Sequence, residues 1–498
     1  MDNDRPSEVS KEDNSNGNAA PNVRKRKLPL RTKLAYSSGA LNEGAVTAAG
    51  ITTLVFYYQV LGVAPELCGV AFMIAAIVDA VSDPLMGALS DRVNTRWGRR
   101  HPFMLAAALP WAVSFYFLYQ PMGGLDETGR FIWLTVFLVL MRLSYTLFAV
   151  PHNALGAELT DDYHERTSVF GYRVVAWSAA SVILGLVVWR VLFPSTPEYD
   201  NGLLNEGRYP LLAGAGAIII FLASVVSTFG TRDQIPFLHE TNSYRPSYKE
   251  YFRNLLRLLA NPSYLAVCVS WLTLATALGI LMVVANITYL YAYELSTEQM
   301  AVLTFLKLPG ILIALPLATY MTRKLDKKLS FMVTALFAAT VIAAPHVFKM
   351  FGMFPGSDSA LYVWLIFAPL FIGYMTLPVM NIVVNSQLVD ICDLQEYKTG
   401  TRDEGVIFAV RTFSMKATMG LGSLIGGFGL KYIEFPDNAK AAELEPGVVN
   451  GLLFMSGPLY FFFMALGVAC MLMYRIDSKR HAEILAVLEE RRAAKGAE

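Results

Sequence analysis

Two aspartates, Asp79 and Asp83, lie four residues apart in a mostly apolar stretch between Leu67 and Leu89. This spacing places both carboxylates on one face of a helix, with their Cβ atoms about 5–6 Å apart. A carboxylate at the depth of a bilayer centre costs on the order of 2.5–3.5 kcal/mol, so a stacked pair is expected to face a water-filled cavity or a cation. The pair therefore predicts an ion-coupling site. The alternative is that it only neutralises basic residues of neighbouring helices.

The elements that position this pair are expected to be membrane-spanning helices. The chain has 498 residues, of which 54% are hydrophobic and 16% charged, and its apolar segments recur along nearly the whole length. About 20 apolar residues suffice to cross a bilayer as a helix. The sequence predicts an all-α membrane protein with twelve such helices: 34–60, 66–90, 102–121, 130–156, 168–193, 209–230, 263–292, 298–321, 329–350, 360–388, 404–433 and 449–474.

The distribution of basic residues predicts the orientation. With the N-terminus inside, the tails and the loops on that side hold Arg24, Lys25, Arg26, Lys27, Arg92, Arg96, Arg99, Arg100, Arg323, Lys324, Lys327, Lys328, Arg480, Arg491 and Arg492. The opposite loops hold chiefly Arg130, Arg208 and Lys440. Because cytoplasmic loops carry the excess of Lys and Arg, both termini are expected in the cytoplasm of a cell whose inner or plasma membrane holds the protein. The first 23 residues lack the apolar segment of a cleaved signal peptide.

The order of the segments predicts two six-helix halves, the plan of a major facilitator transporter. The expected parts are an N-terminal tail (1–33), a first bundle (34–230), a central loop (231–262), a second bundle (263–474) and a C-terminal tail (475–498). In the central loop, apolar positions from Tyr248 to Leu259 alternate with basic ones at helical spacing, which indicates an amphipathic helix on the inner leaflet or a partner-docking helix. The charged C-terminal tail predicts a solvated helix.

Four segments resemble one transporter family, the glycoside-pentoside-hexuronide:cation symporters. They are Lys33 to Ala40; Asp79 to Gly87 with the Asp91-Arg92 and Thr95 to Arg100 segments; Pro151 to Arg166; and Asp390 to Gly405. Each motif is modest alone, but together they span both halves in the order of the family. The resemblance implies a twelve-helix symporter that works by alternating access.

The same resemblance implies a cation site. Asp79 and Asp83 would ligate the coupling cation, Thr146 would face it, and Ser82 stands where a well-known member has Asn. Oxygen ligands suit hard cations, but two close carboxylates can also share one proton. Sodium and proton both remain open, and no cofactor is expected.

Substrate residues are implied less directly. Arg173 matches a sugar-binding arginine and Lys416 a lysine near the central cavity; the alternative for both is charge balance against Asp79 and Asp83. Gly44, preceded by Glu43, stands where a well-known member of the family has a sugar-binding aspartate. Ala149 replaces a second sugar-binding aspartate and Asn153 replaces a stacking tryptophan. The cation machinery is therefore expected to be retained and the sugar pocket rebuilt, with aromatic residues such as Trp177 available to stack on a sugar.

Two further groups are expected to gate the inner side. Arg92, Gly98, Arg99 and Arg100 form the first, although any inner loop can be basic. Asp393, Glu396 and Arg402 belong to the second, an acidic and basic group for which a metal site is the weaker interpretation.

These observations predict a secondary transporter that moves a small hydrophilic solute, a mono-, di- or oligosaccharide or a glycoside, with sodium or protons. The solute and the lipid bilayer are the partners that the sequence indicates, and a nucleic-acid partner is not expected. A lipid or lysolipid carrier of the same fold is one alternative, and a non-transporting membrane sensor is another. The sequence contains no P-loop, HExxH or GxSxG motif, so an enzyme is not expected.

Overall fold

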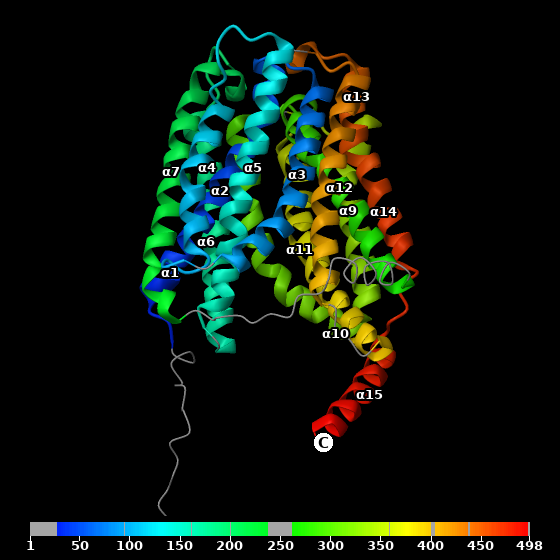
Figure 1. Cartoon of the computed structure of the whole chain (residues 1–498). Coiled ribbons are helices and arrows are strands. Elements are labelled where there is room, and N and C mark those ends of the chain that lie inside the picture. The colour runs from blue at the N-terminus through cyan, green and yellow to red at the C-terminus, as the bar shows by residue number, and fades with distance from the viewer. Residues whose placement is uncertain are drawn as a thin grey trace, which may run out of the picture.

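The computed structural model describes residues 27–93, 95–160, 162–199, 201–237, 261–357, 359–399, 404–436 and 439–496. These parts of the chain are helical apart from turns, loops and one isolated bridge between Thr95 and Gly98. Nine of the described helices are long and apolar enough to cross a membrane. They run side by side as one bundle, with α15 (Ser478–Gly496) projecting from one end (Figure 1).

The first group of helices extends from Leu30 to Gly230. Its elements are α1 (Leu30–Ser38), α2 (Ala40–Val55), the π-helical turn η2 (Phe56–Val60), α3 (Pro65–Arg92), α4 (His101–Leu118), α5 (Glu127–Glu158), α6 (Tyr163–Val187), the π-helical turn η3 (Val188–Leu192) and α7 (Tyr209–Gly230). Local sequence explains where they begin. Proline stands in the first turn of α3, α4 and α7, where its missing N–H has no helical partner to lose. Asp126 and Asp162 cap α5 and α6 by accepting backbone N–H groups.

The second group extends from Pro262 to Met471. Its main elements are α9 (Pro262–Ile287), η7 (Thr288–Ala292), α10 (Thr297–Met350), α11 (Ala360–Thr399), α12 (Glu404–Tyr432), α13 (Pro446–Phe454), η9 (Met455–Leu459) and α14 (Tyr460–Met471). Ser296 and Gln299 form a reciprocal capping box at the start of α10.

Three expectations from the sequence have different outcomes. The expected spans 298–321 and 329–350 are two helical stretches within α10, and the break expected between them is present as a kink at Asp326, whose backbone is non-helical (φ 63°, ψ 160°). The expected amphipathic helix, at Tyr248 to Leu259, lies outside the described residues. The helix expected in the C-terminal tail is present as α15, but the prediction that it is solvated is wrong for one face, because Ile484 and Leu488 pack into an apolar cluster with residues of α11.

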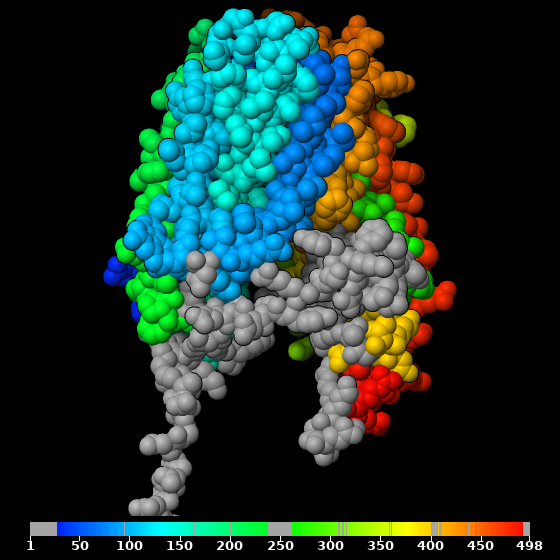
Figure 2. All heavy atoms as spheres, viewed as in Figure 1, coloured from blue at the N-terminus to red at the C-terminus, as the bar shows by residue number. Residues whose placement is uncertain are grey.

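The two groups meet along α3 and α12, which lie against each other on the face shown in Figure 2. We call the end of the bundle at which α1 begins and α15 lies the tail end, and the opposite end the far end. At the far end, an apolar cluster joins both groups and includes Tyr58 and Phe435. Gln59 accepts a hydrogen bond from the backbone of Ala439, 3.0 Å away, and Ser195 lies 2.9 Å from Thr297 Oγ1. The far end is therefore closed in this conformation.

Candidate functional site

Asp79 and Asp83 lie in the middle of α3, where that helix faces both α5 and α12. The side chain of Asp79 is 6% exposed and that of Asp83 is 22% exposed. As the spacing predicts, both carboxylates are on one face of the helix, because both contact Thr146 of α5. Thr146 Oγ1 lies 3.1 Å from Asp79 Oδ1 and 2.9 Å from Asp83 Oδ1.

Hydroxyl groups complete the oxygen cluster. Ser82 Oγ lies 3.1 Å from Thr146 Oγ1 and 3.2 Å from the carbonyl oxygen of Asp79. Since Thr146 has a single hydroxyl proton, it can donate to only one carboxylate at a time. The Oδ1 atom that does not accept this proton can therefore accept from another donor or bind a cation. The structure thus brings together the four residues expected at the cation site.

Lys416 of α12 places its ammonium group at these carboxylates. Its Nζ lies 3.0 Å from Asp79 Oδ2 and 2.5 Å from Asp83 Oδ2. Nη1 of Arg142, from α5, lies 4.0 Å from the same oxygen, Asp79 Oδ2. Two carboxylates therefore face two basic side chains, and the site is close to electrically neutral without a bound ion.

Arg173 of α6 lies elsewhere, paired with Glu43 of α2. Its Nη2 donates to Glu43 Oε1 over 2.6 Å, and the two side chains are 18% and 15% exposed. The Nε of Arg173 is buried and has no hydrogen-bond partner among the described residues. Of the two basic residues expected at the substrate, Lys416 thus lies at the aspartate pair and Arg173 lies at Glu43.

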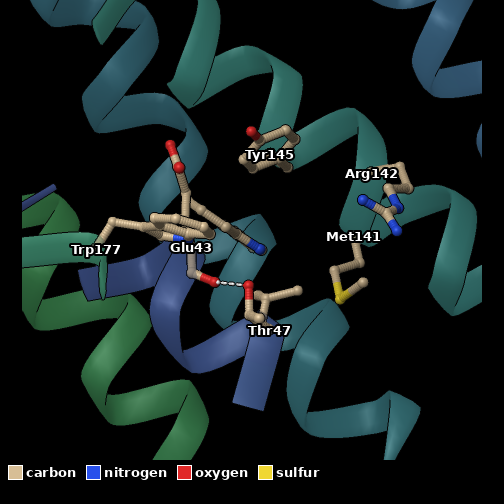
Figure 3. Close-up of a pocket in the computed structure, with 8 residues that line it drawn as sticks. Glu43, Thr47, Met141, Arg142, Tyr145 and Trp177 are labelled. Atoms are coloured by element: carbon tan, nitrogen blue, oxygen red, sulfur yellow. Dashed lines mark hydrogen bonds between the residues drawn. The ribbon is translucent and has the colours of Figure 1, made fainter. Parts of the chain in front are cut away.

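A cavity of about 250 Å³ adjoins this ion pair. It is lined by Glu43, Val46, Thr47, Trp111, Met141, Arg142, Tyr145 and Trp177. Figure 3 shows Glu43 and Thr47 of α2 opposite Arg142 and Tyr145 of α5, with Trp177 beside Glu43. Aromatic faces and a few charged groups around a cavity are typical of a site for a polar small molecule. Asn153 is exposed on α5 and is not part of this lining.

Two residues that line the cavity connect it to the aspartate pair, Arg142 directly and Tyr145 through Lys416. Arg142 lines the cavity and lies 4.0 Å from Asp79, while the ring of Tyr145 lies 5.9 Å from Lys416 Nζ. Neither Arg142 nor Tyr145 was predicted from the sequence. Arg142 could have been, because it is a charged residue inside the apolar segment 130–156, where an ionisable group indicates a functional position.

The residues expected to gate the inner side lie at the tail end. Arg99 and Arg100 both contact Glu158 Oε1, at 3.2 and 2.8 Å, and Arg100 also reaches Asp91 at 2.6 Å. Gly98 has φ +75°, a conformation that favours glycine, and Arg92 is exposed.

The second expected gating group contains Asp393, which lies 3.1 Å from His481 of α15. Glu396 is half-buried on α11, and Arg402 lies outside the described residues. The contact of Asp393 joins α11 to α15, and a role of either set of residues in gating stays a prediction.

Comparison with known proteins identifies the family. The profile described as MFS/sugar transport protein matches residues 35–478. The putative glycoside/cation symporter YagG of Escherichia coli is 26% identical over 473 residues, which cover 94% of this chain and 97% of YagG. The isoprimeverose transporter of Lactiplantibacillus pentosus is 23% identical over 483 residues, which cover 95% of this chain and 94% of that protein.

A solved structure shows the same fold. The crystal structure of the nucleoside transporter NupG aligns with a TM-score of 0.57 at 13% identity, over 90% of this chain and 99% of NupG. The resemblance to cation symporters and the expectation of a transporter rather than an enzyme are confirmed by the family and its members. The chain is a multi-pass, all-α membrane protein that belongs to the MFS/sugar transport protein family.

Proposed function

We propose that this protein is a cation-coupled symporter of a saccharide or glycoside. The observation that carries the proposal is the connection between cavity and aspartate pair. Arg142 belongs to both, and Tyr145 lies between the cavity and Lys416. A solute that contacts Arg142 or Tyr145 therefore changes the surroundings of Asp79, which is the kind of energetic connection that coupled binding needs.

The coupling ion, sodium or a proton, binds at Asp79 and Asp83 in this proposal. Lys416 Nζ now lies within 3.0 Å of both carboxylates, so an entering cation competes with a tethered ammonium group. Thr146 and Ser82 supply neutral oxygens around the same place. Cation binding then frees Lys416, and because Lys416 lies on α12, the occupancy of the site is transmitted to the second group of helices.

The size of the cavity favours a small hydrophilic solute. The cavity volume of about 250 Å³, compared with roughly 30 Å³ for one water molecule, leaves room for a compact polar solute. A sugar therefore suits it better than a lysolipid with its long acyl chain. Arg173 and Glu43 offer a donor and an acceptor to hydroxyl groups, and Trp177 offers a stacking face. The resemblance to the putative glycoside/cation symporter YagG and to the isoprimeverose transporter supports the same class of solute.

We infer that the chain crosses the membrane twelve times, as two six-helix halves, with α10 contributing two spans that meet near Asp326. The tail end faces the cytoplasm, because the basic side chains of Arg99, Arg100 and Lys327 lie there and Lys/Arg-rich loops are cytoplasmic.

Uptake into proteoliposomes tests the function. Radiolabelled mono- and disaccharides, glycosides and a lysolipid are supplied with an imposed sodium or proton gradient. We expect one saccharide class to accumulate with one gradient in wild type. Asp79→Asn and Asp83→Asn should abolish uphill accumulation, since an amide cannot bind a cation as a charged ligand, while Asp233→Asn, at an exposed position, serves as the matched control. Undiminished accumulation in both site variants, or accumulation of the lysolipid alone, contradicts the proposal.

A further inference from the structure

A second cavity lies at the tail end, away from the transport site. Its volume is about 140 Å³, and its lining is Asn261, Pro262, Ser263, Leu394, Lys398, Arg475, Ile476 and Arg480. Three elements meet here: the start of α9, the last turn of α11, and the segment that connects α14 to α15 together with the first turn of α15. Buried Leu394 and Ile476 give the cavity an apolar base beneath a polar rim.

The rim is strongly basic. Lys398, Arg475 and Arg480 are exposed, and within the part of the chain that the structure describes none of the three forms an ion pair. By contrast, the nearby Lys327 lies 2.6 Å from Asp390. Three unneutralised cations around one small cavity attract an anion, and the positive end of the α9 dipole adds to that attraction.

Asn261 provides an independent sign of a ligand. It caps α9, with its Oδ1 accepting the backbone N–H of Ser263 over 3.1 Å. The residue is 8% exposed, and its Nδ2 has no hydrogen-bond partner among the described residues. A buried amide N–H₂ without an acceptor is costly, and Asn261 lines the cavity. An anionic oxygen bound in this cavity would supply the missing acceptor.

We propose that this cavity is a binding site for a phosphate group, either inorganic phosphate or the headgroup of an anionic lipid. The tetrahedral oxygens accept from Asn261 Nδ2 and from the side chains of Lys398, Arg475 and Arg480. A phosphate monoester fits best, because its charge of about −1.5 to −2 at neutral pH is matched by three cations. Bound phosphate would tie α15 to the ends of α9 and α11, in addition to the contacts of His481 with Asp390 and Asp393.

Thermal unfolding of the full-length protein in nanodiscs tests the site. One series contains phosphatidylcholine discs titrated with inorganic phosphate, with chloride holding the ionic strength constant. A second replaces part of the phosphatidylcholine with phosphatidic acid and omits free phosphate. An anion that binds only the folded protein raises the unfolding temperature. A rise in the first series alone assigns the site to soluble phosphate, a rise in the second alone assigns it to a lipid headgroup, and a rise in both leaves it open to either source; each supports the proposal.

Three variants make the test specific. Asn261→Asp keeps the helix cap, since Asp and Asn cap equally well, but it removes the Nδ2 donor and adds a repelling charge. This change and the double change Arg475→Gln/Arg480→Gln should each weaken phosphate binding by about tenfold or more. Lys479→Gln removes a charge from the same turn of α15 but not from the cavity lining, and it should retain the response. No phosphate response in wild type, or an equal response in all variants, overturns the proposal.

Discussion

At the scale of single residues, Lys416 determines the state of the proposed cation site. Its ammonium group lies at both carboxylates of the aspartate pair, where it provides the positive charge that a bound sodium ion or proton would otherwise supply. This ammonium group attracts the same carboxylate oxygens that an entering cation needs. The site is therefore expected to bind the coupling cation less tightly than the two aspartates would without Lys416.

Replacing Lys416 by methionine should therefore tighten binding of the coupling cation by about tenfold or more, while uphill transport is lost because occupancy is no longer communicated to α12. Calorimetric titration of purified protein with sodium, and its dependence on pH, measures this. Lys431→Met is the control, because Lys431 is 60% exposed and pairs with Glu66 outside the site. Unchanged or weaker cation binding in Lys416→Met would show that Lys416 does not compete with the ion.

Arg173 offers a second test at this scale. One of its terminal nitrogens is held by Glu43, while its buried Nε lacks a partner among the described residues. A guanidinium group can hold Glu43 and still donate to a solute, whereas the single ammonium of lysine cannot reproduce this planar arrangement. Arg173→Lys should weaken solute binding by about tenfold or more, because a hydrogen bond involving a charged group contributes about 1.5–3 kcal/mol.

Solute binding should be measured with the cation held saturating, so that a lost ion site is not mistaken for a lost solute contact. Glu43→Gln is the companion variant: it keeps a hydrogen-bond acceptor for Arg173 but removes the charge. An affinity of Arg173→Lys within about twofold of wild type, which is below the energy of one such hydrogen bond, would limit Arg173 to pairing with Glu43.

Sequence alone could predict the aspartate pair but not its partner. Asp79 and Asp83 stand out because charge is costly in an apolar segment and their spacing fixes their common face. Arg142, Arg173 and Lys416 all lie within expected spans, and local spacing does not relate a residue of α12 to one 333 positions earlier in α3. Only the packing of α3 against α5 and α12 assigns Lys416 and Arg142 to the pair and leaves Arg173 to Glu43.

At the scale of elements, Glu165 connects α6 to the beginning of α1. Its carboxylate accepts a hydrogen bond from the backbone N–H of Leu28 over 2.8 Å, and it lies 2.7 Å from Lys33 Nζ. Burial raises the pKa of Glu165, but the hydrogen bonds from Lys33 and Leu28 and the charge of Lys33 outweigh it and hold the pKa below its usual value of 4.5. Ionised Glu165 is therefore favoured by the folded state.

The stabilisation from Glu165 should depend on pH. A carboxylate whose pKa is lowered by folding stabilises the protein above its unfolded pKa, and this contribution is lost as the pH falls through the folded value. Glu165→Gln should thus lower the unfolding temperature near pH 7, and its difference from wild type should shrink once the pH drops below 4.5. Glu206→Gln, at an exposed position, controls for general acid effects. A difference that stays constant down to about pH 3 would contradict this role.

Element boundaries show where sequence patterns succeed and fail. The starts of α3, α7 and α9 at Pro65, Tyr209 and Pro262 follow from local rules, because each helix has a proline in its first turn, and few other helical positions tolerate proline. The break within α10 follows less directly from local rules. The charged segment around Asp326 predicts a loop between two spans, whereas the structure confines the non-helical backbone to Asp326 itself.

At the scale of the whole molecule, closure of the far end depends on close approach of α3 and α12. A Cβ atom on Gly427 would lie 2.5 Å from the carbonyl oxygen of Pro65 and 3.1 Å from the Cα of Gly69. Glycine is needed here because two backbones touch. Since α3 and α12 belong to different groups of helices, the same contact joins the two groups near Tyr58 and Phe435.

Gly427→Ala should therefore disfavour the closed far end and shift the population towards an outward-open form. Overpacking costs about 1–3 kcal/mol, so a rise of roughly tenfold in exposure of the far end is expected.

The readout is a single cysteine at Ser195, which lies 2.9 Å from Thr297 in the closed form, in a protein whose four native cysteines are replaced. A membrane-impermeant maleimide added from outside should label it faster in Gly427→Ala than in the parent. Gly447→Ala, at a far-end position with no atom within 4 Å of the added carbon, should label at the parental rate. Equal rates in both variants would contradict closure through α3 and α12, and labelling only from the cytoplasmic side would reverse the proposed orientation.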